Sequence, residues 1–303
     1  MILSRKSQEL GLGTVQFGLA YGVANESGRV PVDEAVNITR FAGQVGLSLI
    51  DTASAYGESE LIVGQCLRAV TNRKFKVVTK TVPLRTNSVG DADLQNVQDN
   101  FLSSLSKIGP DSVYGLMVHH ANDLLVPGGE RLFEQLLHWR DQGLVEKIGV
   151  SIYDKIQIDQ LFAKYSFDLV QLPLNIFDQR LLNNGALSFL HDKGVEVHAR
   201  SLLLQGVLLM PPEKLPAHLK ALSPFLIKFQ TLAMKSNMTP LAAAFSFVKQ
   251  LKEVSVALVG VLSVAHLKEC MDAYESKSEF DYLGFSQTDD FLIDPRCWPN
   301  TSR

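Results

Sequence analysis

The sequence contains few cysteines and no long apolar run. Its three cysteines, Cys66, Cys270 and Cys297, are too scattered among 303 residues for a disulfide framework or a zinc site. No segment reaches the roughly 18 consecutive apolar residues that a membrane-spanning helix needs, and residues 1–6 lack the apolar core of a signal peptide. We therefore expect a cytoplasmic protein with no membrane partner and no bound metal.

An excess of positive charge is also lacking. The chain has 29 Lys and Arg residues against 32 Asp and Glu residues, for a formal net charge of −3. Proteins that bind nucleic acid or anionic membranes through phosphates carry a basic surplus, so we expect neither partner. Hydrophobic residues make up 46% of the chain, which is ample for a large core.

Short apolar segments alternate with segments of helical periodicity along the chain. Strands are predicted at 10–18 (followed by a loop at 19–31), 47–50, 75–80, 113–118, 145–150, 168–172, 195–199 and 254–259. Helices are predicted at 33–45, 58–69, 94–108, 132–139, 155–165, 181–190, 225–235, 240–250 and 264–275.

This alternation predicts parallel βαβ units. Eight units at this length favour a closed (β/α)8 TIM barrel over an open Rossmann-type sheet, and no G-x-G-x-x-G motif follows any predicted strand. We expect a single α/β domain over residues 1–303, with a weakly structured tail from about residue 276.

Polar side chains with acid–base chemistry follow three neighbouring strands. Asp51 and Tyr56 follow the second, Lys80 ends the third, and His119 and His120 follow the fourth. In a barrel these strand ends face one mouth. A tyrosine beside an ammonium group should have a lowered pKa and act as a general acid, with Asp51 as the counter-charge of Lys80. Such a set delivers a proton but contains no nucleophile, which favours hydride transfer to a carbonyl group.

Five motifs together resemble the aldo-keto reductase family. They are D-T-A-S-A-Y-G-E-S-E at 51–60, V-V-T-K at 77–80, V-Y-G-L-M-V-H at 113–119, K-I-G-V-S at 147–151 and V-Q-L-P-L-N at 170–175. The resemblance runs from residue 10 to about 270. It implies an NAD(P)H-dependent enzyme that reduces an aldehyde or ketone to an alcohol on a (β/α)8 barrel.

The resemblance also implies a role for each candidate catalytic residue. Tyr56 would be the general acid, Lys80 and Asp51 would tune it, and His119 would orient the carbonyl group, with His120 on the substrate side. The alternatives are a cofactor-sensing regulatory protein resembling potassium-channel β subunits, and an aldolase that uses Lys80 as a Schiff base. The complete Asp-Tyr-Lys-His set favours the reductase.

Contacts with the cofactor are implied along four strand ends and two loops. Ser151 and Gln171 would hold the nicotinamide carboxamide, although Gln171 could instead cap the barrel core. Residues 201–206 would wrap the pyrophosphate and 260–269 the adenosine end. The implied cofactor-binding residues are Gly13, Thr14, Ser151, Gln171, Arg200, Ser201, Leu203, Gln205, Gly260, Ser263, His266 and Glu269.

The sequence departs from the family pattern at three places. Ile152 replaces an asparagine that usually contacts the carboxamide, and Arg200 replaces an aromatic ring that often stacks on the nicotinamide. The Arg200 guanidinium could stack there instead, or pair with a carboxylate. The 260–269 loop is poor in the basic residues that many relatives use for the 2′-phosphate, so the family base rate favours NADPH while NADH stays open.

A short 121–129 loop and a short tail predict a shallow, open substrate pocket. Tyr21 and His120 are the residues expected to line it, with Arg200 and Trp298 as further candidates. Such a pocket suits a small polar or sugar-like carbonyl compound better than a steroid. Nothing in the sequence indicates an oligomeric state.

Overall fold

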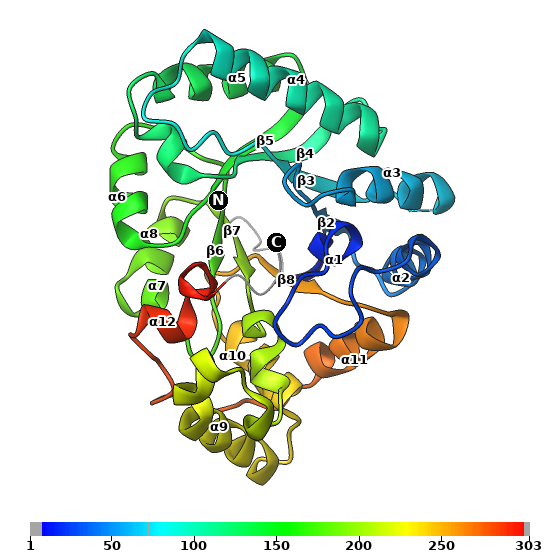
Figure 1. The fold of residues 1–303 in the computed structure, drawn as a ribbon, viewed down its shortest axis with the longest axis vertical. Helices are drawn as coiled ribbons and strands as arrows, with labels where there is room; N and C mark the ends of the chain where they lie inside the picture. The colour runs from blue at the N-terminus through cyan, green and yellow to red at the C-terminus, as the bar shows by residue number, and fades with distance from the viewer. Residues whose placement is uncertain (1–7, 72, 300–303) are drawn as a thin grey trace, which may run out of the picture.

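The computed structural model describes residues 8–71 and 73–299, so the 1–6 segment lies outside the described residues. Eight parallel strands form a closed barrel in chain order, which confirms the predicted (β/α)8 TIM barrel. The strands lie inside a ring of helices (Figure 1). They are β1 Glu9–Gly13, β2 Leu49–Asp51, β3 Lys76–Lys80, β4 Val113–Val118, β5 Val145–Ser151, β6 Leu169–Pro173, β7 Glu196–Arg200 and β8 Val256–Gly260.

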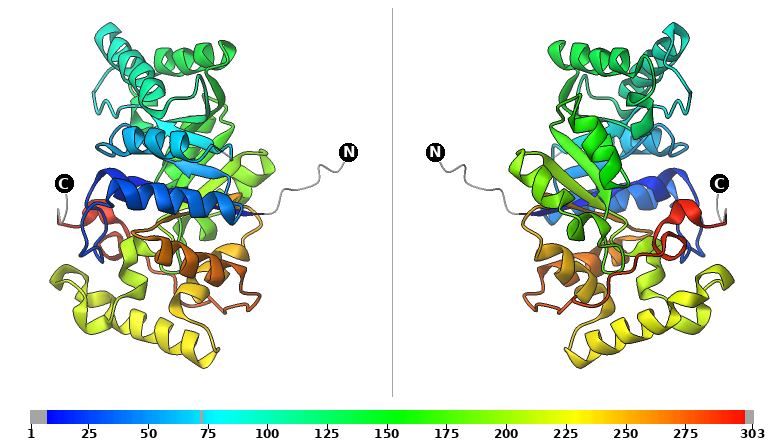
Figure 2. Two further views of the ribbon diagram at one scale, coloured as in Figure 1. Left: turned by 90° about the vertical axis from the view of Figure 1, so that its right-hand side faces the viewer. Right: turned by 90° about the vertical axis from the view of Figure 1, so that its left-hand side faces the viewer.

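The helices that follow the strands form the outer layer in all three views (Figures 1 and 2). They are α2 Val32–Gln44, α3 Ser59–Ala69, α4 Asp91–Ile108, α5 Gly129–Asp141, α6 Lys155–Phe162, α7 Arg180–Asn183, α8 Ala186–Asp192, α10 Pro240–Lys249 and α11 Val264–Glu275. An extra helix, α9 Ser223–Lys235, lies at the end of the molecule opposite α4 and α5 (Figure 1). Among the described residues, no helix is both long and apolar enough to cross a bilayer.

Two predicted elements were wrong in their extent. The first strand ends at Gly13, and Val15–Gly18 forms the short helix α1, because the backbone of Thr14 leaves the extended conformation (φ −118°, ψ 15°) and its carbonyl oxygen accepts a hydrogen bond from the N–H of Phe17. The helix predicted at 181–190 is two helices, α7 and α8, separated by Gly185 with a φ of 79°. A left-handed residue of this kind ends a helix.

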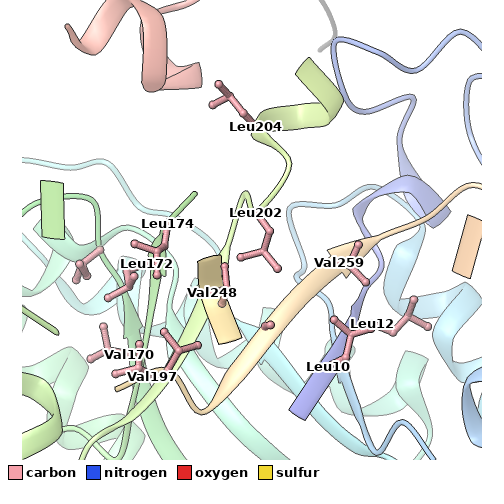
Figure 3. Packing of buried hydrophobic residues seen from close by; sticks show 14 of the residues in the cluster. Leu10, Leu12, Val170, Leu172, Leu174, Val197, Leu202, Leu204, Val248 and Val259 are labelled. Carbon is pink, nitrogen blue, oxygen red and sulfur yellow. The ribbon is translucent and has the colours of Figure 1, made fainter. Parts of the chain in front are cut away.

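The core has an inner and an outer layer. Large apolar side chains, including Leu49, Met117 and Leu169, fill the inside of the barrel. A larger cluster lies between the strands and the helices, and Leu12 and Val259, which are register partners on β1 and β8, belong to it (Figure 3). Since the barrel interior is filled with side chains, a ligand site can form only at its mouth.

The segment after α11 has little regular structure but is well packed. Up to residue 299, where the described part of the chain ends, it contains only the short helix α12 Asp290–Ile293 and one 3-10 turn, Pro295–Cys297. The rings of Phe280 and Phe285 are buried against Phe229 of α9. Trp298 is also buried, and its indole N–H donates to the carbonyl oxygen of Phe291. The tail therefore covers the barrel with side chains rather than with long helices.

Candidate active site

A cavity of about 670 Å³ opens at the mouth of the barrel, where the carboxyl ends of the strands meet. It falls within the size range of small-molecule and cofactor sites. Most of the residues that the sequence analysis selected line it together: Gly13, Thr14, Tyr21, Asp51, Tyr56, His119, Ser151, Gln171, Arg200, Ser201, Leu203, Gln205, Gly260, His266 and Glu269.

Four selected residues lie outside the cavity lining, and one of them is Trp298, which is buried in the tail. Lys80 is buried behind it and is 1% exposed. The hydroxyl of Ser263 caps α11 by accepting a hydrogen bond from the backbone N–H of His266. The ring of His120 is held by Asp123, with 2.8 Å between Nδ1 and Oδ1, and does not reach the cavity. Its position does not support the predicted role of His120 in the substrate pocket.

A buried ion pair forms the floor of the site. The Lys80 ammonium donates to Oδ1 and Oδ2 of Asp51 at 2.8 and 2.9 Å, and to the carbonyl oxygen of Thr52 at 2.9 Å. These contacts use all three N–H donors of the lysine. Gln171 of β6 donates to Oδ2 of the same aspartate at 2.8 Å, so its amide does not merely cap the core. The pair is thus fixed from three strands.

Tyr56 is placed over this ion pair by a turn that follows β2. Its ring lies 5.0 Å from Lys80 Nζ and makes an edge contact with the His119 ring, with 5.8 Å between ring centroids. The turn is anchored at Ser59, whose hydroxyl donates to the carbonyl oxygen of Thr14 and whose backbone N–H donates to that of Tyr56. The phenol, the imidazole and the ion pair therefore form one packed cluster.

The turn also depends on the absence of a side chain at Gly18. A Cβ atom on Gly18 would lie 1.7 Å from the carbonyl oxygen of Tyr56 and 2.6 Å from the Ser59 nitrogen. We predict that Gly18→Ala lowers the free energy of unfolding by about 1–3 kcal/mol and displaces Tyr56, and that urea unfolding and assays will show both losses. Gly90→Ala is the control, because its Cβ would have no heavy atom nearer than 3.7 Å. Equal stability of the two variants would contradict the prediction.

The ionisation of Tyr56 differs from the sequence-based expectation. Burial raises the pKa of Tyr56, and the Asp51 carboxylate raises it further. The predicted lowering by Lys80 was therefore wrong, because it considered the ammonium group without the burial and without the carboxylate that neutralises it. The phenol is protonated at neutral pH, which is the form a proton donor needs.

His119 is held neutral. Burial, together with the positive charges of Lys80 and Arg200, lowers its pKa to about 3. Its Nδ1 atom is buried and has no hydrogen-bond partner among the residues that the structure describes. A neutral imidazole can donate one hydrogen bond to a carbonyl oxygen and does not titrate between pH 5 and 8. Of the two adjacent histidines, only His119 is placed to do so.

This buried histidine predicts a pH dependence of stability. The unfolded chain takes up a proton at His119 near pH 6.5, whereas the folded chain does so only near pH 3, so stability falls as the pH drops below 6.5. His119 should account for a loss of about 2 kcal/mol between pH 7 and pH 5. Urea unfolding of the wild type and of His119→Gln at both pH values measures it as the difference between their losses. Equal losses would contradict the assignment.

Features of the cavity wall fit a dinucleotide. Ser151 and Gln171 lie side by side as register partners on β5 and β6. Gln16 lines the cavity, and its amide oxygen is buried with no hydrogen-bond partner among the described residues. This oxygen can therefore accept a hydrogen bond from a ligand. A Cβ on Gly260 would lie 2.4 Å from that oxygen, so a side chain at this position would displace the Gln16 amide. Gln16 was missed by the sequence analysis because it follows no predicted strand end.

The 201–206 loop above the cavity is strained. Ser201, Leu204 and Gln205 have φ values of 60°, 48° and 55°, a region that residues other than glycine rarely occupy. Such strain gathers at functional sites and ligand clamps. The Gln205 amide also donates to the Tyr21 hydroxyl at 3.1 Å, so the two loops meet across the cavity. Burial raises the pKa of Tyr21 to about 12, and this phenol is neutral too.

Arg200 contacts an aromatic ring instead of a carboxylate. Its guanidinium carbon lies 4.3 Å from the centroid of the Tyr153 ring. Within residues 8–71 and 73–299, no carboxylate lies within ion-pair distance of it, so the alternative of a salt bridge is wrong. Tyr153 also lines the cavity and was missed, although it lies two residues after Ser151. No group of three or more His, Cys, Asp or Glu side chains suited to a metal occurs in the described part of the chain.

Comparisons with known proteins agree on one family. A family model described as "Aldo/keto reductase family" matches residues 9–289. The NADH-specific methylglyoxal reductase of Escherichia coli (strain K12) is 28% identical over 215 residues, covering 66% of this chain and 64% of that protein. L-galactose dehydrogenase of Arabidopsis thaliana is 26% identical over 301 residues, covering 93% and 88%. The chain thus spans less than two thirds of the length of the first relative.

Solved structures show the same fold. The holo form of an aldo-keto reductase from Bacillus halodurans has a TM-score of 0.73 at 17% identity and covers 94% of this chain and 95% of that one. An aldo-keto reductase from Klebsiella pneumoniae, solved in complex with NADPH, has a TM-score of 0.66 at 20% identity and covers 89% and 86%.

Proposed function

The chain belongs to the aldo/keto reductase family, and we propose that it is an enzyme that reduces the carbonyl group of a small aldehyde or ketone with a nicotinamide cofactor. The observation that carries the proposal is the cluster of Tyr56, His119 and the Lys80–Asp51 ion pair at the cavity. A protonated phenol and a neutral imidazole at one wall can together bind and protonate a single oxygen atom.

The bound cofactor supplies the hydride to the carbonyl carbon. Tyr56 donates its proton to the carbonyl oxygen, on which negative charge develops as the hydride arrives. His119 donates a hydrogen bond to the same oxygen and so orients the substrate. The positive charge of Lys80 lies 5.0 Å from the phenol ring and stabilises the phenolate that remains, while Asp51 holds the ammonium in place.

The cofactor would lie along the wall that these residues share with Ser151 and Gln171. Their side chains would hold the carboxamide, and backbone N–H groups of the 201–206 loop would meet the pyrophosphate. NADPH is the proposed cofactor, because it is the more frequent cofactor in the family. NADH is a second candidate, because Glu269 of α11 lines the cavity and a carboxylate there favours a ribose hydroxyl over a phosphate. The Escherichia coli relative is named NADH-specific.

A cofactor-sensing regulatory protein and an aldolase are the alternatives. A sensor that transfers no proton would not need a buried proton donor or its ion pair. The cluster of Tyr56, His119 and the Lys80–Asp51 ion pair is complete, which favours the enzyme. An aldolase would need an accessible lysine nitrogen for its Schiff base. The Lys80 nitrogen lies outside the cavity lining and already donates to Asp51 and Thr52, which disfavours that chemistry.

Turnover of a substrate panel tests the proposal. The wild type should oxidise NADPH or NADH in the presence of at least one aldehyde or ketone from a panel that includes acidic, neutral and sugar-like compounds. Fluorescence titration with each cofactor, run alongside, separates binding from turnover. Tight cofactor binding with no oxidation on any compound would support the sensor, and tighter binding of NADH than of NADPH would reverse the cofactor assignment.

A further inference from the structure

Arg200 is a cation without a counter-charge in the catalytic cavity. It is the last residue of β7, is half-buried, and lines the cavity together with Tyr56 and His119. Its two hydrogen bonds are long, at 3.4 Å to the carbonyl oxygen of Ile152 and 3.5 Å to the Ser201 hydroxyl. Because a guanidinium group has five N–H donors, most of its capacity is left for a ligand.

The aromatic ring that Arg200 contacts is also contacted by a residue of the C-terminal tail. The Tyr153 ring contacts two guanidinium groups, with Arg200 at 4.3 Å and Arg296 at 3.6 Å from its centroid. Arg296 is paired with Asp294, with 3.0 Å between Nε and Oδ1. The tail therefore neutralises one of the two guanidinium groups and leaves the other charged beside the cavity.

The other groups of the catalytic cluster add no net charge, and Arg85, whose positive charge also acts on His119, does not line the cavity. Lys80 and Asp51 neutralise each other, and burial keeps Tyr56 and His119 in their neutral forms. Arg200 is thus the source of one uncompensated positive charge next to the proton donor. A half-buried charge loses part of its solvation, and the charge-assisted hydrogen bonds of an anionic ligand group would restore it.

We propose that Arg200 binds the carboxylate of the substrate, so that the preferred substrates are carbonyl compounds that also carry a carboxylate, such as aldehyde acids and keto acids. The inference rests on the proposed function and narrows it to one substrate class. In the reaction, the carbonyl carbon receives a hydride from the reduced nicotinamide and the oxygen receives the Tyr56 proton. The carboxylate is unchanged, and the product is a hydroxy acid with an oxidised cofactor.

A matched pair of aldehydes tests this assignment. 4-Carboxybenzaldehyde and its methyl ester differ in charge and little in shape. The wild type should show kcat/KM at least about tenfold higher for the acid, because a charge-assisted hydrogen bond contributes enough free energy for a factor of that size. Arg200→Gln should bring the ratio close to one, and Arg200→Lys should keep part of it. Lys214→Gln, which removes the same charge from an exposed residue of the cavity lining, should leave the ratio unchanged.

Two results would overturn the inference. One is a wild-type ratio of one or less. The other is an equal loss on both aldehydes in Arg200→Gln with weaker NADPH binding by fluorescence, which would assign Arg200 to the cofactor. Calorimetric titration with benzoate needs no turnover, and Arg200→Gln should bind it at least about tenfold more weakly than the wild type. If the wild type binds benzoate more tightly than Arg200→Gln but oxidises neither cofactor, the reductase function is rejected and the anion site is kept. If the two proteins bind benzoate equally, the anion site is rejected.

Discussion

Replacing Tyr56 with phenylalanine is expected to lower kcat by about a thousandfold, within the range of about 10²–10⁴ that a general acid contributes. The substitution removes one oxygen atom and keeps the ring that packs against His119 and Lys80. Cofactor affinity and stability should therefore change little. Steady-state assays on an active carbonyl compound measure the loss, and fluorescence titration measures cofactor binding.

Tyr21→Phe provides the matched control. It also removes a buried phenol from the same cavity, one whose hydroxyl accepts a hydrogen bond from Gln205. We expect it to change kcat less than about tenfold, since its proton is not the one transferred. If Tyr56→Phe and the wild type turn over at similar rates, Tyr56 is not the general acid.

Replacing Lys80 with methionine should have the largest effect on stability. Methionine fills a similar volume but leaves Asp51, which is 4% exposed, without its counter-charge. Removing one partner of a buried ion pair costs about 3–5 kcal/mol. Only the Gln171 amide would still donate to the carboxylate among the side chains that now contact it. Urea unfolding at pH 7 measures the change in the free energy of unfolding.

A double variant separates the lost charge from the lost side chain. Lys80→Met combined with Asp51→Asn leaves no buried charge, so it should be more stable than Lys80→Met alone. Both variants should be inactive or nearly so, because the phenolate has lost its stabilising cation. A Lys80→Met variant within about 1 kcal/mol of the wild type would mean that the pair is well solvated, against the burial on which the site depends.

The barrel was predictable because its signals are local. Each buried strand is a short apolar run closed by a turn residue, and each helix has its own apolar periodicity. The errors arose where a neighbouring segment decides the outcome. The run 10–18 looks continuous, but Thr14 leaves the extended conformation and starts the short helix α1, so β1 ends early. The apolar spacing over 181–190 gives no sign of the left-handed Gly185 that divides it.

The catalytic cluster was predictable to the extent that it lies at strand ends. Asp51, Lys80 and His119 follow consecutive strands, so topology alone brings them together. Their ionisation was not predictable, since the pKa of Tyr56 depends on burial that no spacing reveals. The contact of Arg200 with Tyr153 joins the ends of two strands, and Arg296 of the tail contacts the same ring. Contacts between residues so far apart in the sequence leave no local signal.

The most direct test of the account follows the hydride. With nicotinamide cofactor that carries deuterium at both positions of C4 of the reduced ring, the wild type should form an alcohol that carries one deuterium on the former carbonyl carbon and a proton on its oxygen. Mass spectrometry and proton NMR of the product locate the label. An alcohol without deuterium on that carbon, or cofactor that binds and is never oxidised by any carbonyl compound, would contradict the account.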